Sequence, residues 1–202
     1  NPYLTMNFKT EAEEIRALFG VPVHLAQADL TQPDQIYSLF SSLDSLLNNA
    51  KRLTFNVLVN SAATMPAGNP RELELKDWDS ALDTNLRAPF LLSQEAAKRM
   101  TAGGLIVNIT DIGAQKAWGR YPSYTVSKAA LESLTKLLAR ALAPNIRVNA
   151  IAPGLVLPSD VVTPGEWERL VNRLPLKRAA TLDEITSALE TLGVDPKTGK
   201  PE

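Results

Sequence analysis

The sequence contains no cysteine and a single histidine, His24. The absence of cysteine excludes disulfides, thiolate zinc sites and cysteine nucleophiles, and a single histidine excludes a metal site that needs two from one chain. Charge of one sign is not in excess either, because 21 basic and 22 acidic residues give a formal net charge of −1. We therefore expect no metal site, and no nucleic acid or membrane partner chosen by bulk electrostatics.

Long apolar runs are also missing. No run reaches the roughly 18 residues of a membrane span, and no signal peptide opens the chain, so a soluble, cytoplasmic protein is expected. The hydrophobic share is 45% over 202 residues, which is enough to fill the core of one large domain. We accordingly expect residues 1–202 to form a single domain.

Short β-branched runs alternate with longer amphipathic stretches along the chain. The pattern predicts strands at residues 3–7, 21–28, 55–59, 104–110 and 146–151, and helices at residues 10–19, 31–50, 76–100, 121–142, 166–173 and from 181 onward. Crossovers of this length join parallel strands that are covered by helices on both faces. The expected fold is α/β with a doubly wound parallel sheet, whose ligands bind at the carboxyl ends of the strands.

Tyr124 and Lys128 are the clearest local indication of chemistry. Their spacing of four puts both on one face of a predicted helix, one turn apart. An ammonium beside a phenol favours the phenolate, so we expect the pKa of Tyr124 to fall from its usual value of about 10. Such a residue can give and take a proton while a polarised double bond is reduced. The same spacing also fits a partly exposed helix face without function.

The pair belongs to a longer pattern that resembles the short-chain dehydrogenase/reductase family in order and spacing. The segments that carry the resemblance are Asp29-Leu30, Leu58-Val-Asn60-Ser-Ala-Ala63, Asn85, Asn108-Ile-Thr-Asp111, Tyr124-Thr-Val-Ser-Lys128 and Asn145-Ile-Arg-Val-Asn149-Ala-Ile-Ala-Pro153-Gly154. They extend over about residues 3–190. The resemblance implies a Rossmann-type sheet and NAD(P)-dependent hydride transfer.

By this resemblance, Tyr124 would be the general acid, Lys128 would lower its pKa and hold the nicotinamide ribose, and Asn85 would anchor a proton-relay water. The other cofactor-binding positions would be Asp29, Leu30, Asn60, Ala62, Pro153 and Gly154. Lys9 and Thr10 follow the first predicted strand, at a place that lacks the acidic residue which would accept hydrogen bonds from the ribose hydroxyls of NAD. Both can bind a 2′-phosphate, so NADPH is the expected cofactor. Alternatively, Lys9 is an exposed loop charge.

Glycine is scarce in a way that departs from this family. The chain has 10 glycines, and no two are spaced as Gly-x-Gly, so the family's glycine-rich pyrophosphate turn is missing. Residues 3–9 resemble the family's second strand and the loop after it, and Thr198-Gly199-Lys200 stands where the family has Thr-Gly-Gln. We therefore expect a Rossmann-type domain that is incomplete at both ends. The alternative is a non-catalytic relative that lost its phosphate turn.

Asp111 is a second departure, because the position thirteen before the tyrosine usually carries serine. An aspartate there resembles the pteridine reductase subgroup, which implies reduction of a pteridine or a similar cyclic C=N substrate, with Asp111, Met65 and Tyr124 contacting the substrate. Met65 stands where that subgroup has a stacking aromatic residue, which keeps an ordinary carbonyl or 3-oxoacyl reductase open as the alternative. Asp111 could also simply cap loop amides at a strand end.

The helices predicted at residues 76–100 and 121–142 carry apolar residues on more than one face, which predicts subunit interfaces. The apolar residues concerned are Leu86, Phe90, Leu91, Leu92, Leu131, Leu134, Leu137 and Leu138. The family resemblance implies that the assembly is a homotetramer.

Overall fold

The computed structural model describes residues 8–49, 54–100, 103–116, 118–158 and 162–193. Contacts between residues divide the chain into two compact units, the smaller comprising Asn1–Gln27 with Leu155–Leu182 and the larger Ala28–Gly154 with Asp183–Glu202. The single domain predicted for residues 1–202 therefore remains a prediction, and the two units are described one at a time.

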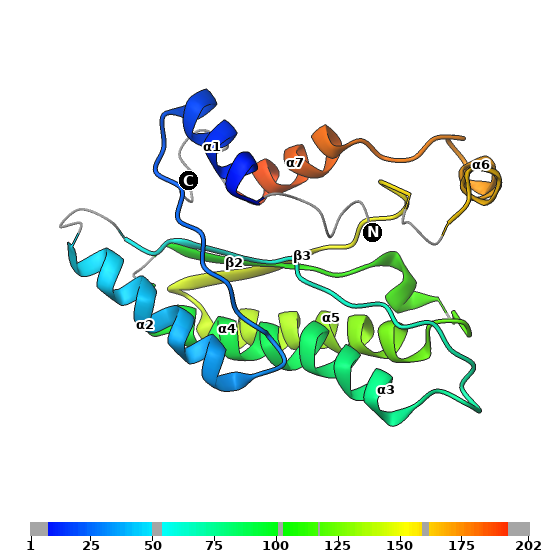
Figure 1. The fold of residues 1–202 in the computed structure, drawn as a ribbon, viewed down its shortest axis with the longest axis horizontal. Coiled ribbons are helices and arrows are strands. Elements are labelled where there is room, and N and C mark those ends of the chain that lie inside the picture. Colours follow the sequence, from blue (N-terminus) through cyan, green and yellow to red (C-terminus); the bar gives the residue numbers. More distant parts are fainter. Residues whose placement is uncertain (1–7, 50–53, 101–102, 117, 159–161, 194–202) are drawn as a thin grey trace. The chain divides into compact units, whose positions relative to one another are not determined.

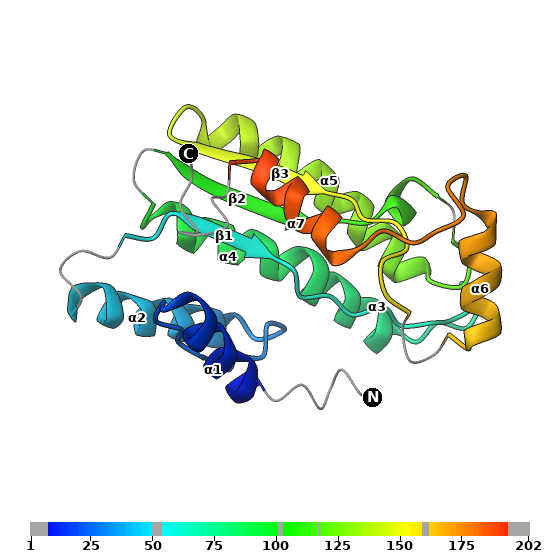
Figure 2. The same ribbon diagram turned by 90° about the horizontal axis from the view of Figure 1, so that it is seen from above.

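The larger unit is built on a parallel three-stranded sheet with the order β1-β2-β3 (Figure 2). The strands are β1 (Val57–Asn60), β2 (Gly104–Ile109) and β3 (Ile146–Ile151). Val57 pairs with Leu105, and Ile109 pairs with Ile151, so β2 and β3 end side by side. β2 is buried along almost its whole length, which explains why Leu105, Ile106 and Val107 follow one another without polar residues between them.

One face of this sheet is covered by helices (Figure 1). They are α2 (Pro33–Asn49), α3 (Leu75–Leu82), α4 (Ala88–Ala97) and α5 (Pro122–Leu142). Their apolar sides form one core with the sheet, in which Ile36 and Phe40 of α2 and Ile106 of β2 are buried. Later in the sequence, α7 (Leu182–Thr191) is joined to the first residues of β3 by Arg147, whose Nη1 donates 2.7 Å to the carbonyl of Leu192.

The smaller unit contains α1 (Phe8–Phe19) and α6 (Pro164–Arg173). Gly20 ends α1 with a φ of 63°, and its amide donates 2.9 Å to the carbonyl of Arg16. Thr163 and Glu166 form a reciprocal capping box at the start of α6.

Most of the predicted elements are present, and the α/β prediction of a Rossmann-type parallel sheet with helices is confirmed. The strand predicted at residues 21–28 is wrong, because this segment is irregular and pairs with no strand in the part of the chain that is described. The strand predicted at residues 3–7 lies outside the described residues. Among the helices that are described, none is both long and apolar enough to cross a membrane.

Two predicted helices differ from the structure in detail. α1 begins at Phe8, so Lys9 and Thr10 lie in its first turn rather than in a loop. The helix predicted at residues 76–100 is not continuous, because a π-helical turn (Asp83–Arg87) separates α3 from α4. Asn85 lies in this turn.

Candidate active site

The candidate site lies where β2 ends and α5 begins. Tyr124 and Lys128 both project from the first two turns of α5, as their spacing predicts, and only 7% and 3% of their surfaces are exposed. A partly exposed helix face is therefore excluded for this pair. Two polar groups buried at the end of a parallel strand are in the place where α/β folds bind their ligands.

Asp111 joins the end of β2 to Tyr124. The Oη atom of Tyr124 donates a hydrogen bond of 2.7 Å to Oδ2 of Asp111, while Oδ1 accepts one of 2.5 Å from the amide of Gly113. Asp111 thus caps the 3₁₀ turn Ile112–Gln115, as one of its two alternatives predicted, and also holds the phenol, while its contact with a substrate stays a prediction. A Cβ atom at Gly113 would lie 2.9 Å from Oδ1 of Asp111 and 2.7 Å from Cζ3 of Trp118, so a side chain there would force these groups to move.

The pKa of Tyr124 is raised, not lowered as the sequence predicted. Burial of the phenol is the main cause, and the hydrogen bond and negative charge of Asp111 add to it. Lys128 is not among the groups that shift this pKa, although its Nζ atom lies 5.8 Å from the centre of the Tyr124 ring. Tyr124 therefore holds its proton at neutral pH, as a proton donor must.

Lys128 is held by the backbone at the end of β2. Its Nζ atom donates 2.7 Å to the carbonyl of Ile109. Burial lowers the pKa of Lys128, and the charge of Asp111 acts in the opposite direction. The ammonium has two further hydrogens that could bind hydroxyl groups of a ligand.

Asn85 is fully buried and ties three segments together. Its Oδ1 accepts 2.8 Å from the amide of Thr64, and its Nδ2 donates to the carbonyl of Thr64 at 2.8 Å and to Oγ of Ser127 at 2.9 Å. Ser127 in turn donates 2.7 Å to the carbonyl of Tyr124. Since both amide hydrogens of Asn85 are already used, its side chain positions α5 here, and water anchoring by this residue stays a prediction.

Ser127 and Thr64 are two further residues of the site that were not predicted from the sequence. Ser127 was detectable, because it is three residues after Tyr124 on the same side of a helix and directly precedes Lys128. Thr64 carried no such indication, since it contributes only its backbone, from a loop 21 residues away from Asn85.

The predicted cofactor residues occupy different surroundings. Asp29 is exposed in a turn ahead of α2, whereas the side chain of Leu30 packs against the core. Asn60 is only 6% exposed and donates 2.8 Å to Oδ1 of Asn108, so its amide nitrogen belongs to the core rather than to a ligand surface. Its Oδ1 has no hydrogen-bond partner among the described residues.

The remaining predicted residues lie in loops or in the other unit. Ala62 and Met65 are exposed in the loop after β1, and Met65 is 41% exposed. Pro153 and Gly154 follow β3, where the carbonyl of Pro153 accepts 3.2 Å from the amide of Ile112, so the backbones after β2 and β3 are joined. Lys9 and Thr10 are both exposed, and both belong to α1 of the smaller unit.

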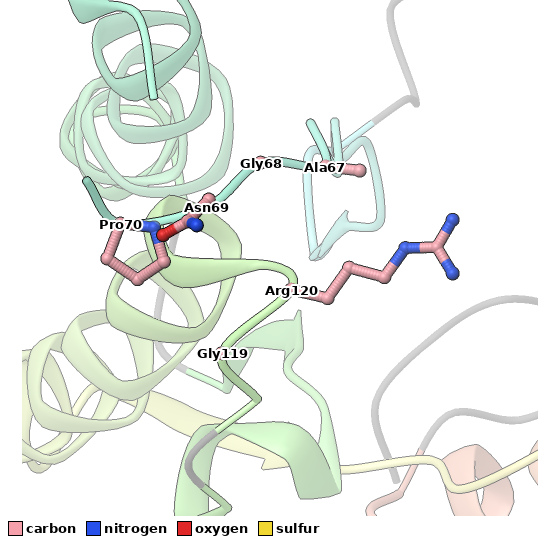
Figure 3. A pocket seen from close by; sticks show the side chains of 6 residues that line it. All are labelled: Ala67, Gly68, Asn69, Pro70, Gly119 and Arg120. Atoms are coloured by element: carbon pink, nitrogen blue, oxygen red, sulfur yellow. The ribbon is translucent and has the colours of Figure 1, made fainter. Parts of the chain in front are cut away.

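A hollow of about 580 Å³ lies between the loop at residues 67–70 and residues 119–120 (Figure 3). The amide of Gly68 donates 2.9 Å to the carbonyl of Arg120, which joins its two sides. Tyr124, Lys128 and Asp111 are not among its lining residues. No cluster of three metal-ligating side chains occurs in the described ranges.

Comparisons with known proteins agree with this architecture. A family model described as enoyl-(acyl carrier protein) reductase matches residues 3–198. A short-chain type dehydrogenase/reductase from Picea abies is 30% identical over 185 residues, which cover 87% of this chain and 66% of that protein. The 3-oxoacyl-[acyl-carrier-protein] reductase of Aquifex aeolicus is 29% identical, over 90% of this chain and 73% of the relative.

Solved structures give the same result. The FolM alternative dihydrofolate reductase 1 from Brucella canis, crystallised as a complex with NADP, superimposes with a TM-score of 0.81 and 34% identity, over 91% of this chain and 71% of that one. The chain therefore spans about two thirds of the length of the Picea relative and somewhat more of the Brucella structure.

Proposed function

Because the chain belongs to the short-chain dehydrogenase/reductase family, we propose that it is an NADPH-dependent oxidoreductase that reduces a pteridine or a similar cyclic C=N substrate. The observation that carries the proposal is the 2.7 Å hydrogen bond from Tyr124 Oη to Asp111 Oδ2. It puts a carboxylate beside the proton donor, where the family usually has a serine. The likeness to the Brucella dihydrofolate reductase supports the same substrate class.

The choice of substrate follows from what an ionised carboxylate can do. A serine hydroxyl can donate to a developing alkoxide, whereas the Asp111 carboxylate cannot, and its charge opposes negative charge on oxygen. Reduction of a C=N bond instead places a proton on nitrogen. Tyr124 Oη would give that proton, and the Asp111 carboxylate would accept from the N–H and amino groups at the edge of a pterin.

The residues present fit part of NADPH. The Lys128 ammonium has hydrogens left for the nicotinamide ribose, and the exposed Asp29 turn can meet the adenosine end. Lys9 and Thr10 would bind the 2′-phosphate. When bound, NADPH supplies the hydride. This sequence has no Gly-x-Gly turn to hold the pyrophosphate. The residues named here therefore match only the two ends of NADPH, the nicotinamide ribose and the adenosine with its 2′-phosphate.

An ordinary carbonyl or 3-oxoacyl reductase is the second candidate, and Met65 is the observation that favours it. This thioether, 41% exposed, stands where a pterin-stacking aromatic ring is expected. A methionine can still pack against a ring, but less specifically. The Aquifex relative is named for the 3-oxoacyl reaction.

The test follows NADPH oxidation with dihydrobiopterin, folate and a 3-oxoacyl thioester, in the unchanged protein, in Asp111→Ser and in Asp79→Ser. Asp79 is exposed on α3, so its replacement is the matched control. We expect dihydrobiopterin to be the best substrate, NADPH to be preferred over NADH, and Asp111→Ser alone to reduce pterin turnover at least tenfold. If the thioester is the best substrate, or Asp111→Ser leaves pterin turnover unchanged, the carbonyl reductase replaces the proposal. Failure to bind NADPH would favour a non-catalytic relative.

A further inference from the structure

The π-helical turn Asp83–Arg87 carries two side chains that bind different loops. Asn85 binds the loop at Thr64 and the start of α5, as described above. Arg87, two residues later, binds the turn that contains Asp29 and Thr31. Single π turns inside helices often mark functional sites, because the extra residue directs side chains away from the regular helical positions.

The contact of Arg87 is charge-assisted and spans a long stretch of sequence. Its Nη2 donates 2.7 Å to the carbonyl of Thr31, 56 residues earlier, while its Nη1 lies 2.8 Å from Oδ1 of Asp83. Asp83 is one helical turn before Arg87, so this ion pair orients the guanidinium on its own helix. The side chain of Arg87 keeps 44% of its surface exposed, which leaves it near the surface where the turn lies.

The Asp29–Thr31 turn is ordered by its own bonds as well. Oδ1 of Asp29 accepts 2.9 Å from the amide and 2.7 Å from Oγ1 of Thr31, and the amide of Asp29 donates 2.7 Å to Oε1 of Gln35. The bonds from Thr31 hold the pKa of Asp29 below its usual range. Thr31 uses its amide and hydroxyl on Asp29, and Arg87 takes its carbonyl.

We propose that Arg87 is a positioning residue for cofactor binding: it fixes the Asp29–Thr31 turn in the conformation that receives the adenosine half of the dinucleotide. The inference rests on the proposed function, because it assumes that this turn meets adenosine. The same π turn then connects the adenosine end, through Arg87, with the proton-transfer end, through Asn85.

The expected effect is on affinity, not on chemistry. If removal of the guanidinium leaves the turn in its receptive conformation for only a tenth to a fifth of the time, the apparent dissociation constant rises about 5- to 10-fold. Turnover at saturating cofactor should stay within about twofold, since Arg87 touches none of Tyr124, Lys128 and Asp111.

The experiment compares Arg87→Met with Lys76→Met in the same protein. Lys76 is an exposed lysine on α3 that pairs with Glu74, so its replacement removes the same charge from the same helical run. Binding of NADPH and of adenosine 2′,5′-bisphosphate is measured by calorimetry, and hydrogen exchange of the Asp29 and Thr31 amides is measured without ligand. We expect Arg87→Met to weaken both ligands by the same factor and to speed exchange of both amides, with Lys76→Met unchanged.

Each result has a distinct meaning. If the unchanged protein binds NADPH and Arg87→Met binds it equally well, this inference is overturned while the proposed function stands. The inference also fails if the variant loses affinity for NADPH but not for adenosine 2′,5′-bisphosphate, or if its turn amides exchange at the original rate. If the unchanged protein binds neither ligand, the inference and the NADPH-dependent function fail together.

Discussion

At the scale of single residues, the chemistry depends on which atom holds the proton between Tyr124 and Asp111. The geometry assigns it to Tyr124 Oη, because burial and the neighbouring carboxylate both raise the pKa of the phenol. A phenolate formed by proton donation would face a carboxylate 2.7 Å away, which is unfavourable for two anions. The phenol must therefore regain a proton after each turnover, and the Nζ atom of the buried Lys128 lies 5.8 Å from the centre of its ring.

The proton-donor role predicts the outcome of Tyr124→Phe. This change keeps the ring but removes the proton, so turnover should fall by about 10²- to 10⁴-fold with cofactor affinity nearly unchanged. Steady-state kinetics and direct NADPH titration measure the two effects. Tyr121→Phe, three residues earlier at the start of α5, is the matched control and should stay within about twofold. A Tyr124→Phe protein that keeps most of its activity would disprove the assignment.

The sequence could predict the pairing of Tyr124 and Lys128, because helical spacing alone puts them on one face. It could not predict the direction of the Tyr124 pKa. That direction depends on how deeply the phenol is buried and on where Asp111, thirteen residues earlier, returns to meet it. The sequence also could not predict that Asn85 donates its two amide hydrogens to Thr64 and Ser127.

At the scale of elements, prediction succeeded where burial fixes a pattern. β3 matches its predicted range at residues 146–151, because apolar and polar residues alternate along it and turn residues flank both of its ends. β2 matches its predicted range nearly as well. The segment at residues 21–28 has a similar composition, yet a strand needs a neighbour to take its backbone hydrogen bonds, and none is present in the described part of the chain. The π turn at Asp83–Arg87 could not be predicted, because the residues that form it have no pattern typical of such a turn.

An ion-pair cluster centred on Arg99 joins α2 to the end of α4. The guanidinium binds both carboxylate oxygens of Asp44, at 2.6 and 2.7 Å, and Oε2 of Glu95 at 2.8 Å, and it lies 4.9 Å from the ring centre of Phe40. Lys98 pairs with the other oxygen of Glu95. Hydrogen bonds from Arg99 lower the pKa of Asp44, and those from Lys98 and Arg99 lower the pKa of Glu95.

This cluster predicts how stability depends on pH. A carboxylate whose pKa is lower in the folded state stabilises the protein above the unfolded values, about 3.9 for Asp and 4.3 for Glu, and the gain is lost as the pH falls through the folded values. Arg99→Met should therefore lower the free energy of unfolding at pH 7, because it leaves Asp44 and Glu95 without these hydrogen bonds. The difference from the unchanged protein should remain at pH 5 and shrink below about pH 4.

Urea unfolding at pH 7, 5 and 3 measures this difference. Lys98→Met is the control, because the Lys98 side chain is 58% exposed and its ion pair is screened by solvent. Its loss should be less than half that of Arg99→Met. A pH-independent difference for Arg99→Met would mean that packing against Phe40, and not the carboxylates, accounts for its contribution.

At the scale of the whole molecule, the structure narrows the surface that could bind another subunit. Of the eight apolar residues predicted to form interfaces, Leu92, Leu131 and Leu138 are buried in the core of the same chain, at 9%, 1% and 7% exposed. Leu86, Leu91 and Leu134 are half-buried, and the last two pack against that core. Phe90 on α4 and Leu137 on α5 remain exposed, at 39% and 60%.

The homotetramer is therefore a proposal that now depends on Phe90 and Leu137. Val126 is also exposed, at 45%, and lies eleven residues before Leu137, which is close to three full turns and puts both on one side of α5. We predict that light scattering of the unchanged protein gives four times the 22.0 kDa chain mass. Phe90→Glu with Leu137→Glu should give smaller species, because burying two carboxylates without partners opposes association. Tyr37→Glu, at a residue 42% exposed on α2, should keep the original mass. A monomeric unchanged protein, or a double variant that still has the fourfold mass, would show that α4 and α5 do not form the interface.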